Sequence, residues 1–149
     1  MRVFIGSDHA GYVLKESLIE YLNELKCEVV DCGAFKYDKS DDYIDFIRPV
    51  ALAVTQNPGS RGVVIGKSGQ GEAIVSNRYS GIRSVVYYGG NLEIVRLSRE
   101  HNDSNVLSLG AGFLTEHEAK EAMKLWLETP FTGGRHQRRI DKIDSLYEG

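Results

Sequence analysis

Short apolar runs rich in β-branched residues alternate along this chain with segments whose apolar residues recur at helical spacing. The runs predict strands at residues 2–6, 29–30, 63–65, 82–87 and 106–109. The helical spacing predicts helices at residues 13–25, 43–56 (with a kink or a delayed start at Pro49), 73 onward, 92–100, 115–127, and a last amphipathic helix with Ile140, Ile143 and Leu146. This alternation predicts an α/β fold built on one open parallel sheet.

The composition fits one compact domain over residues 1–149. Of these residues, 42% are apolar and 26% are charged, which are ordinary values for a soluble globular protein. The net charge of −3 gives no general attraction to nucleic acid or to a membrane surface, and no apolar run is long enough to span a membrane. Cys27 and Cys32 match neither a redox nor a zinc spacing, so we expect two buried reduced thiols and a cytoplasmic location.

A glycine-rich loop follows the third predicted strand and leads into the short helix. Gly66, Gly69 and Gly71 allow positive φ angles and the close approach of a ligand to the backbone. Amide groups at the start of the following helix would then face an anion. Ser68 adds a hydroxyl and Glu72 a carboxylate. Oxyanion donors beside a carboxylate base are what proton abstraction next to a carbonyl requires.

A P-loop, a dinucleotide-binding turn and a purely structural turn are the alternatives for this loop. A P-loop needs four residues between its first glycine and the Gly-Lys-Ser, but Gly62 precedes Gly66 by only three. A dinucleotide fingerprint fails because Ile74 stands where its third glycine belongs. The structural alternative stays open: Glu72 would then only favour the helix dipole.

Three polar clusters accompany the loop. Asp8 and His9 follow the first strand, where the alternative is an N-cap beside a surface histidine. Residues 99–103 (Arg-Glu-His-Asn-Asp) end the fourth long helix, where they also suit a helix C-terminus. A basic cluster comprises Arg135, His136, Arg138 and Arg139. Guanidinium groups suit bidentate phosphate recognition, and no aromatic residues interleave as single-stranded nucleic acid would require.

Ligands of parallel α/β sheets bind beyond the carboxyl ends of the strands. We therefore expect residues 8–9, 66–72 and the loops after the fourth and fifth strands to meet in one cleft. An anion-stabilising loop, a carboxylate base, imidazoles and a phosphate clamp are the needs of an aldose–ketose isomerase that acts on a sugar phosphate through an ene-diolate.

The chain resembles the ribose-5-phosphate isomerase B family, which includes galactose-6-phosphate and allose-6-phosphate isomerases. The resemblance covers essentially the whole length. It rests on the segments 6–11 (GSDHAG), 66–72 (GKSGQGE), 77–78 (NR), 81–83 (GIR), 99–103 (REHND) and 133–139 (GGRHQRR). It implies a Rossmann-like three-layer sandwich with a five-stranded parallel sheet. It also implies a homodimer with shared sites, without metal or organic cofactor, nucleic acid or membrane, and leaves tetramers open.

The resemblance also implies roles for individual residues. Glu72 is the base, in the place of a cysteine that many members carry at the position of Gly66. Asp8 and His101 assist ring opening of the sugar. The developing ene-diolate oxygen is held by Ser68, Gly69, Gln70 and Gly71.

The resemblance further implies that other positions bind the sugar phosphate, as follows. His9, Arg135 and Arg139 bind the phosphate, the two arginines reaching over from the partner subunit on the C-terminal helix. Tyr43 lines the sugar site. The remaining substrate-binding positions are Asn102 and His136.

Three departures bear on the substrate. Gly112 stands where many members carry an arginine, Ile44 where a proline is usual, and Lys67 where a small residue is usual. The expected activity is interconversion of ribose 5-phosphate and ribulose 5-phosphate. The alternatives are an isomerase of a hexose 6-phosphate of the allose or galactose type and, from another class, a non-catalytic sugar-phosphate or nucleotide sensor.

Overall fold

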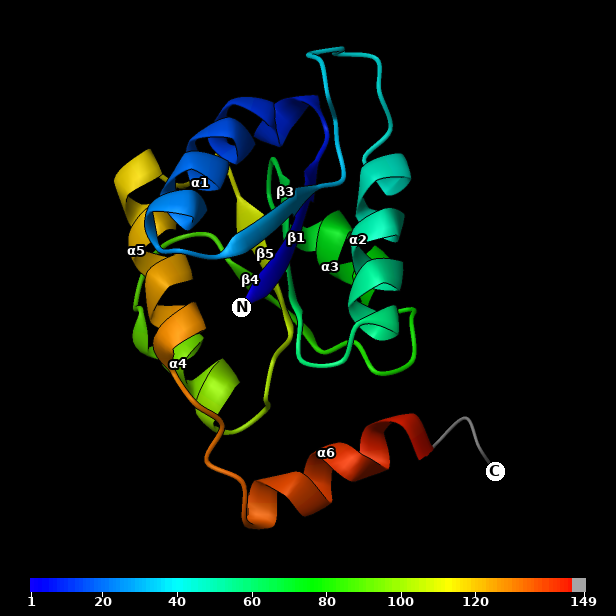
Figure 1. Cartoon of the computed structure of the whole chain (residues 1–149), viewed down its shortest axis with the longest axis vertical. Coiled ribbons are helices and arrows are strands. Elements are labelled where there is room, and N and C mark those ends of the chain that lie inside the picture. Colours follow the sequence, from blue (N-terminus) through cyan, green and yellow to red (C-terminus); the bar gives the residue numbers. More distant parts are fainter. Residues whose placement is uncertain (146–149) are drawn as a thin grey trace.

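The computed structural model describes residues 1–145, and its architecture is shown in Figure 1. The elements in chain order are β1 (Arg2–Ser7), a 3₁₀ turn (His9–Gly11), α1 (Tyr12–Glu24), β2 (Glu28–Asp31), α2 (Ile44–Gln56), β3 (Arg61–Gly66), α3 (Gln70–Ser76), β4 (Ser84–Tyr87), α4 (Glu93–Glu100), β5 (Val106–Gly110), α5 (Glu116–Glu128) and α6 (Arg135–Ser145). The expected α/β fold with five parallel strands is confirmed.

The sheet has the strand order β2-β1-β3-β5-β4, and all four strand pairs are parallel. From β1 the chain moves outward to β2 and then returns across the sheet to β3. The strand order therefore reverses between β1 and β3. At such a switch point the loops beyond the carboxyl ends diverge and leave a crevice for a ligand.

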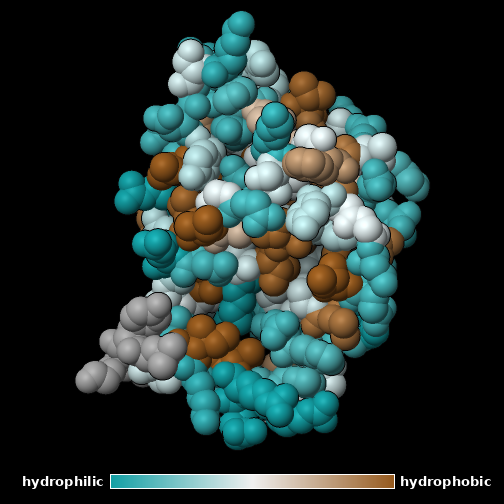
Figure 2. All heavy atoms as spheres, turned by 180° about the vertical axis from the view of Figure 1, so that it is seen from behind, coloured by the Kyte–Doolittle hydropathy of each residue, from teal (hydrophilic) through white to brown (hydrophobic). Residues whose placement is uncertain are grey.

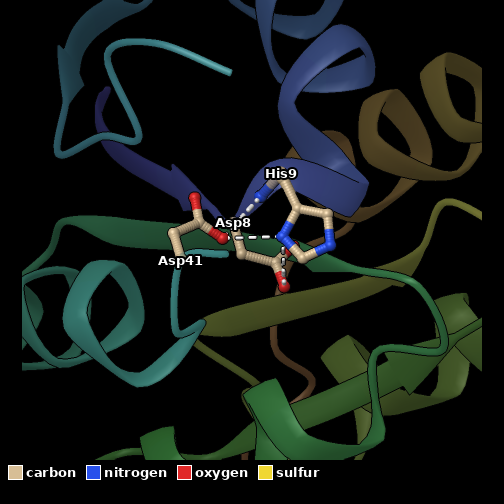
Figure 3. Close-up of side chains that lie close together, drawn as sticks. All are labelled: Asp8, His9 and Asp41. Atoms are coloured by element: carbon tan, nitrogen blue, oxygen red, sulfur yellow. Dashed lines mark hydrogen bonds and ion pairs between the residues drawn. The ribbon is translucent and has the colours of Figure 1, made fainter. Parts of the chain in front are cut away.

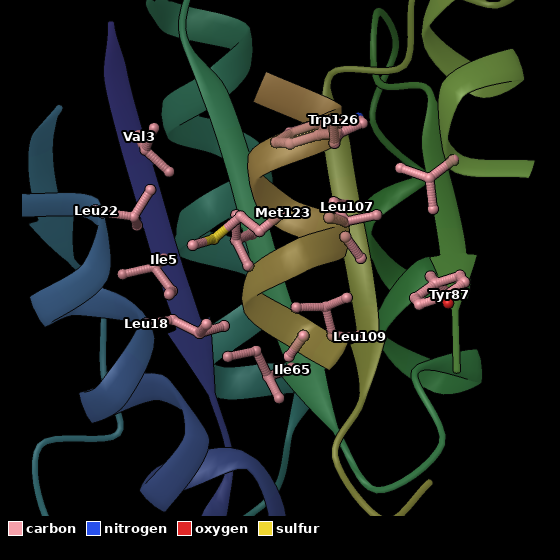
Figure 4. Packing of buried hydrophobic residues seen from close by; sticks show 14 residues of the cluster. Val3, Ile5, Leu18, Leu22, Ile65, Tyr87, Leu107, Leu109, Met123 and Trp126 are labelled. Carbon is pink, nitrogen blue, oxygen red and sulfur yellow. The ribbon is translucent and has the colours of Figure 1, made fainter. Parts of the chain in front are cut away.

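Helices cover both faces of the sheet, which gives three layers (Figure 1). On one face, α1, α4 and α5 pack over a core that includes Leu18, Leu107 and Trp126 (Figure 4). On the other face, α2 and α3 lie over a smaller core that includes Ile47 and Val64. Thr115 caps α5 through a capping box with Glu118. Both faces of the central strands are buried, which explains their continuous apolar sequences.

Some boundaries differ from the sequence-based predictions. The short helix α3 begins at Gln70 rather than Ala73, so Glu72 lies in its first turn. Pro49 lies inside a continuous α2, without the expected delayed start. Strand β4 begins two residues later than expected. Both cysteines are free but only partly buried. Leu146 lies outside the described residues.

The last helix, α6, lies beneath the amino ends of the strands (Figure 1). Two side chains are its main anchors on its own chain. The His136 ring stacks on the His101 ring, with 4.3 Å between the ring centroids. The Asp144 carboxylate accepts a 2.8 Å hydrogen bond from the Gly81 amide. His136 is the one buried residue of this helix within its described length. Most of α6 therefore projects from the domain that carries it.

Candidate active site

The loops that follow β1 and β3 border the switch point, and we call the region between them the crevice. Asp8 and His9 come directly after β1, and residues 67–69 connect β3 to α3. β1 and β3 are adjacent, with Ser7 opposite Ile65 in the register. The structure thus brings the first polar cluster and the glycine-rich loop together at the carboxyl edge of the sheet, as the sequence predicts.

Glu72 is the most buried carboxylate of this crevice, with 5% of its surface exposed. Its carboxyl group fills the space in which a Cβ at position 66 would lie, so a side chain at Gly66 and Glu72 in this position exclude each other. Burial raises the pKa of Glu72, and the nearby Asp8 carboxylate adds to this, while the backbone amides of Glu72 and Gly69 oppose it. A desolvated carboxylate of raised pKa is a stronger base than one in water.

The loop in front of Glu72 is shaped for an anion. Gly69 has φ +81°, which turns the chain from β3 into α3, and its carbonyl accepts a 2.6 Å hydrogen bond from Ser108. The Gln70 amide donates to Ser68 Oγ at 3.2 Å. The first-turn amides of α3 therefore lie beside the Glu72 carboxylate, which occupies the same turn.

Tyr43 reaches this loop from the start of α2. A Cβ on Gly71 would lie 2.9 Å from the tyrosine hydroxyl, so the missing side chain at position 71 is what lets the phenol approach the backbone. The structure therefore places Tyr43 against the loop, where the sequence-based prediction has it line the sugar site.

Asp8 and His9 form a cluster with Asp41, a residue of the long loop between β2 and α2 (Figure 3). The His9 Nδ1 atom lies 2.7 Å from Asp41 Oδ1 and 4.0 Å from Asp8 Oδ2. Burial raises the pKa of Asp8, although His9 and the amides of Ala10 and Gly11 lower it in part. The pKa of His9 is raised, chiefly by its hydrogen bond to Asp41.

In residues 1–145 this is the one group whose imidazole and carboxylate atoms lie close enough, within 4.8 Å, to suit a metal ion. Two of those atoms, His9 Nδ1 and Asp41 Oδ1, already bond to each other. In this structure the cluster is therefore closed by a hydrogen bond between His9 and Asp41 rather than an open set of ligands.

A second group of predicted site residues lies at the opposite edge of the sheet. His101 caps the end of α4, and Asn102 follows it, before β5 begins. The five residues of β5, about 16 Å of strand, separate them from the carboxyl edge. Within one chain, His101 and Asn102 are thus remote from Asp8 and Glu72.

Two arginine side chains hold the backbone of the loop that carries His101 and Asn102. The buried Arg99 donates to the Ser104 carbonyl at 2.7 Å and to Asp103 Oδ1 at 2.8 Å. Arg83 Nε donates to the Asp103 carbonyl at 2.9 Å. The backbone is therefore fixed, while His101 and Asn102 remain exposed.

His136, Arg135 and Arg139 join this second group through α6. Stacking brings His136 against His101, and burial lowers the pKa of His136, helped by His101 and both arginines. Arg135 and Arg139 are exposed. An imidazole pair flanked by two guanidinium groups can bind an anion such as phosphate. Within the described residues of one chain, this surface lies away from Glu72.

Lys67 and Gly112 are neighbours at the end of the crevice. The Lys67 stem lies directly over Gly112, with Cγ 3.0 Å from where a Cβ at position 112 would be. The two departures noted in the sequence are therefore one structural feature, in which a lysine side chain covers a position without a side chain. An exposed ammonium group is added to the crevice at this point.

Sequence reasoning missed Asp41. No spacing or hydrophobic pattern separates it from Asp38 and Asp42 in the same polar loop, so its contact with His9 emerges only in three dimensions.

Comparison with known proteins agrees with the fold and identifies the family. A family model described as Ribose/Galactose Isomerase matches residues 3–143. The chain belongs to this family. A ribose-5-phosphate isomerase B of Mycobacterium leprae is 42% identical over 142 residues, which cover 95% of this chain and 86% of that protein. None of the helices in the described part of the chain has the length and apolar character to cross a bilayer.

Solved structures of the family superpose closely on this chain. A ribose-5-phosphate isomerase B of Clostridium thermocellum matches with a TM-score of 0.94 and 40% identity, over 99% of this chain and 98% of that one. The enzyme of Mycoplasma genitalium, solved with bound ribulose 5-phosphate, matches with a TM-score of 0.94 and 36% identity, over 99% and 96% of the two chains.

Proposed function

We propose that this protein interconverts ribose 5-phosphate and ribulose 5-phosphate through an ene-diolate, with Glu72 as the base. The observation that carries the proposal is the buried Glu72 carboxylate beside the first-turn amides of α3. Membership of the ribose/galactose isomerase family and the likeness to an enzyme solved with ribulose 5-phosphate support this choice of substrate.

In the proposed reaction, the Glu72 carboxylate removes the proton from C2 of the opened aldose. The released electron pair forms the C1–C2 double bond, and negative charge moves to the carbonyl oxygen at C1. Ser68 and the amides of residues 69–71 stabilise that oxygen. The carboxylic acid then returns the proton to C1, and the hydroxyl proton at O2 is transferred to the oxygen at C1, which becomes the hydroxyl of the ketose as the ketone forms at C2. Asp8, with its raised pKa, assists the preceding ring opening.

Substitution of the base tests this proposal directly. Glu72→Gln keeps the size and polarity of the side chain but cannot accept the proton, so isomerisation should fall at least ~10²-fold. Exchange of the C2 proton with deuterated solvent should fall equally, while the affinity for a substrate analogue changes little. Glu116→Gln, in the exposed first turn of α5, is the matched control. Exchange near the wild-type rate in Glu72→Gln would place the base elsewhere.

We further propose that two copies of the chain complete each site. The residues proposed to bind phosphate and assist ring opening, His101, Asn102, Arg135, His136 and Arg139, lie at the edge of the sheet opposite Glu72. A partner related by two-fold symmetry can present this edge to the crevice of the first chain, and the reverse contact then completes the second site.

The surface beside α3 suits such a contact. Ile74 of α3 is 60% exposed and Ile44 of α2 is 39% exposed. Both line a 650 Å³ hollow, whose other lining residues are two apolar or aromatic side chains and two arginines: Val75, Tyr79, Arg48 and Arg78. Hydrophobic residues are exposed across the rear face of the molecule, above the hydrophilic α6 (Figure 2). Exposed apolar patches of this kind mark protein interfaces. Because Glu72 lies on the same short helix, an interface here would border the active site.

Mixed dimers separate a shared site from one contained in a single chain. A dimer of one Glu72→Gln chain and one Arg135→Ala chain carries both defects in one shared site and none in the other. About half of the wild-type activity should then survive, because one of the two sites is intact. A folded mixed dimer with half of the wild-type kcat but the raised KM of Arg135→Ala would place both residues in the site of one chain, whereas a shared site predicts half of the kcat at the wild-type KM.

A hexose 6-phosphate of the allose or galactose type is the second candidate substrate. The Lys67–Gly112 contact favours it, because an ammonium group beside a position without a side chain changes the shape and charge of this end of the crevice. Turnover of ribose, allose and galactose phosphates by the same preparation decides between the two. A kcat/KM at least ~10-fold higher for a hexose phosphate would replace the pentose assignment.

A further inference from the structure

Asp41 is tied to His9 by two hydrogen bonds to the same oxygen. Asp41 Oδ1 accepts from the His9 backbone amide at 3.1 Å and lies 2.7 Å from Nδ1 of the His9 ring. The contact spans 32 residues, because Asp41 is on the loop that runs from β2 to α2. This loop is largely exposed and projects beyond the carboxyl edge of the sheet (Figure 1).

The Asp41 side chain is only 9% exposed. Its second oxygen, Oδ2, is buried and receives no hydrogen bond from the described residues. A carboxylate removed from water in this way needs a neighbouring positive charge to offset its desolvation. Within hydrogen-bonding distance, the group that can supply that charge is the His9 imidazole.

The geometry of the ring fixes where its protons lie. An ionised carboxylate can only accept hydrogen bonds, so His9 Nδ1 carries a proton toward Asp41. Figure 3 shows the other ring nitrogen pointing away from both carboxylates. In a neutral imidazole that nitrogen would be an acceptor and would repel a phosphate oxygen. In the imidazolium form it donates.

We propose that Asp41 is a positioning residue, which fixes the His9 ring and holds it as an imidazolium whose Nε2–H is presented to the substrate phosphate. Asp8, whose Oδ2 lies 4.0 Å from Nδ1, and the more distant Asp38 favour the same charge. The proposal rests on the proposed function for the role of the phosphate. The His9–Asp41 arrangement itself does not depend on which sugar is bound.

The loop between β2 and α2 contacts two parts of the proposed site. Asp41 lies two residues before Tyr43, which contacts the backbone at Gly71. One segment therefore orients the proposed phosphate ligand in the turn after β1 and lines the proposed sugar site over α3. Loss of the Asp41 contact should loosen the phosphate end before it affects the base.

Nitrogen NMR of the His9 ring tests the proposal without any substrate. In the wild-type protein, His9 should titrate above the ordinary value of about 6.5, with Nδ1 protonated throughout the titration. Asp41→Asn should lower its pKa, because the amide cannot stabilise the cation. Asp42→Asn, an exposed neighbour with the same chemical change, should leave it unchanged. A wild-type His9 that titrates at or below 6.5 overturns the proposal, whether or not Asp41→Asn folds.

Kinetics provide the second measurement. Asp41→Asn should raise KM about 10-fold, the loss of one charge-assisted hydrogen bond, and leave kcat within about twofold. In wild type, KM should rise with pH as the His9 imidazolium loses its proton. In Asp41→Asn this rise should begin at a lower pH, which general loosening of the fold would not produce. Asp41→Glu, which restores the charge, should recover part of the affinity. An unchanged pH profile of KM overturns the proposal.

Inorganic phosphate, followed at the His9 resonances, separates this proposal from the proposed function. If no sugar phosphate is turned over, but Asp41→Asn lowers both the His9 pKa and the affinity for phosphate, the positioning role stands and the isomerase assignment fails. If turnover is normal and Asp41→Asn leaves the His9 pKa unchanged, the positioning role fails and the isomerase assignment stands.

Discussion

The two edges of the sheet differ in how much of a site each builds alone. At the carboxyl edge, Asp8, Asp41 and Glu72 are largely buried and fixed by contacts within the chain. At the amino edge, Arg135 and His101 are exposed, although the loop beneath His101 is held firmly. The proposed base and one proposed phosphate ligand, His9, are thus organised by one chain, while the proposed phosphate ligands on α6 and the proposed ring-opening residue His101 face a second surface.

The difference between the two edges follows from how each is anchored within the chain. Loops after parallel strands are anchored on both sides, by the strand that they leave and the helix that they enter. Helix α6 has one buried residue in its described length and few anchors, so its own chain does little to place it. A base needs exclusion from water to act, and cationic phosphate ligands do not. The division between the edges therefore matches the roles proposed for Glu72 and for the two arginines of α6.

The largest expected effect comes from breaking the self-contained edge at Gly66. In Gly66→Ala the new methyl group would occupy the space of the Glu72 carboxyl group, so the base must move. Activity should fall ~10²-fold, as for loss of the base itself. Affinity for inorganic phosphate should change little, because the phosphate ligands are untouched. Activity near that of wild type would show that the position of Glu72 in this structure is not the working one.

A smaller effect is expected from the exposed edge. Arg135→Ala should raise KM about 10-fold, which is the loss of one charge-assisted contact to phosphate. The thermal unfolding midpoint should not change, because Arg135 is exposed and holds no part of its own chain in the described structure. Arg138→Ala, an exposed arginine on the same helix, is the control. An equal KM effect in both variants would indicate general charge attraction rather than a specific contact.

The elements of the fold were largely predictable because burial on both faces leaves continuous apolar runs, and helices leave a clear period. The boundaries that failed were local. The start of α3 is set by the positive φ of Gly69, which no hydrophobic pattern reveals. Pro49 is accommodated inside α2, because tertiary packing of the helix outweighs the local preference of proline.

The candidate site was predictable only in part. The order of strands and loops indicated that Asp8 and Glu72 would share an edge, and the structure places them there. The residues after α4 fall at the opposite edge, because a helix that returns to a parallel strand ends at the amino end of that strand. Asp41 was missed because its importance depends on a contact across 32 residues. The roles of the individual residues stay predictions.

The thermal stability of Glu72→Gln tests the carboxyl edge further. Its unfolding midpoint should differ from that of wild type by a few degrees. Because burial raises the pKa of Glu72 in the folded protein, ionisation costs stability as pH rises through that value. Glu72→Gln should therefore unfold at a higher temperature than wild type at pH 7, and the difference should vanish at low pH, where both forms are neutral. Glu116→Gln should show no such gain. A destabilised Glu72→Gln at pH 7 would mean that its ionised carboxylate is stabilised by its surroundings.

The smallest effect is expected from the cysteines, which belong to neither part of the site. Cys27 precedes β2 and packs against the larger core, and Cys32 follows β2, which is separated from β3 by β1. Burial and the neighbouring Asp31 raise the pKa of the Cys32 thiol, so at neutral pH it is protonated and a poor nucleophile.

The double variant Cys27→Ala/Cys32→Ala should keep activity within about twofold and lose only some stability from the core. Alkylation of the native protein should likewise spare turnover. Inactivation at either thiol that substrate prevents would show that a cysteine takes part in the reaction, and the assignment of Glu72 as the base would then fail.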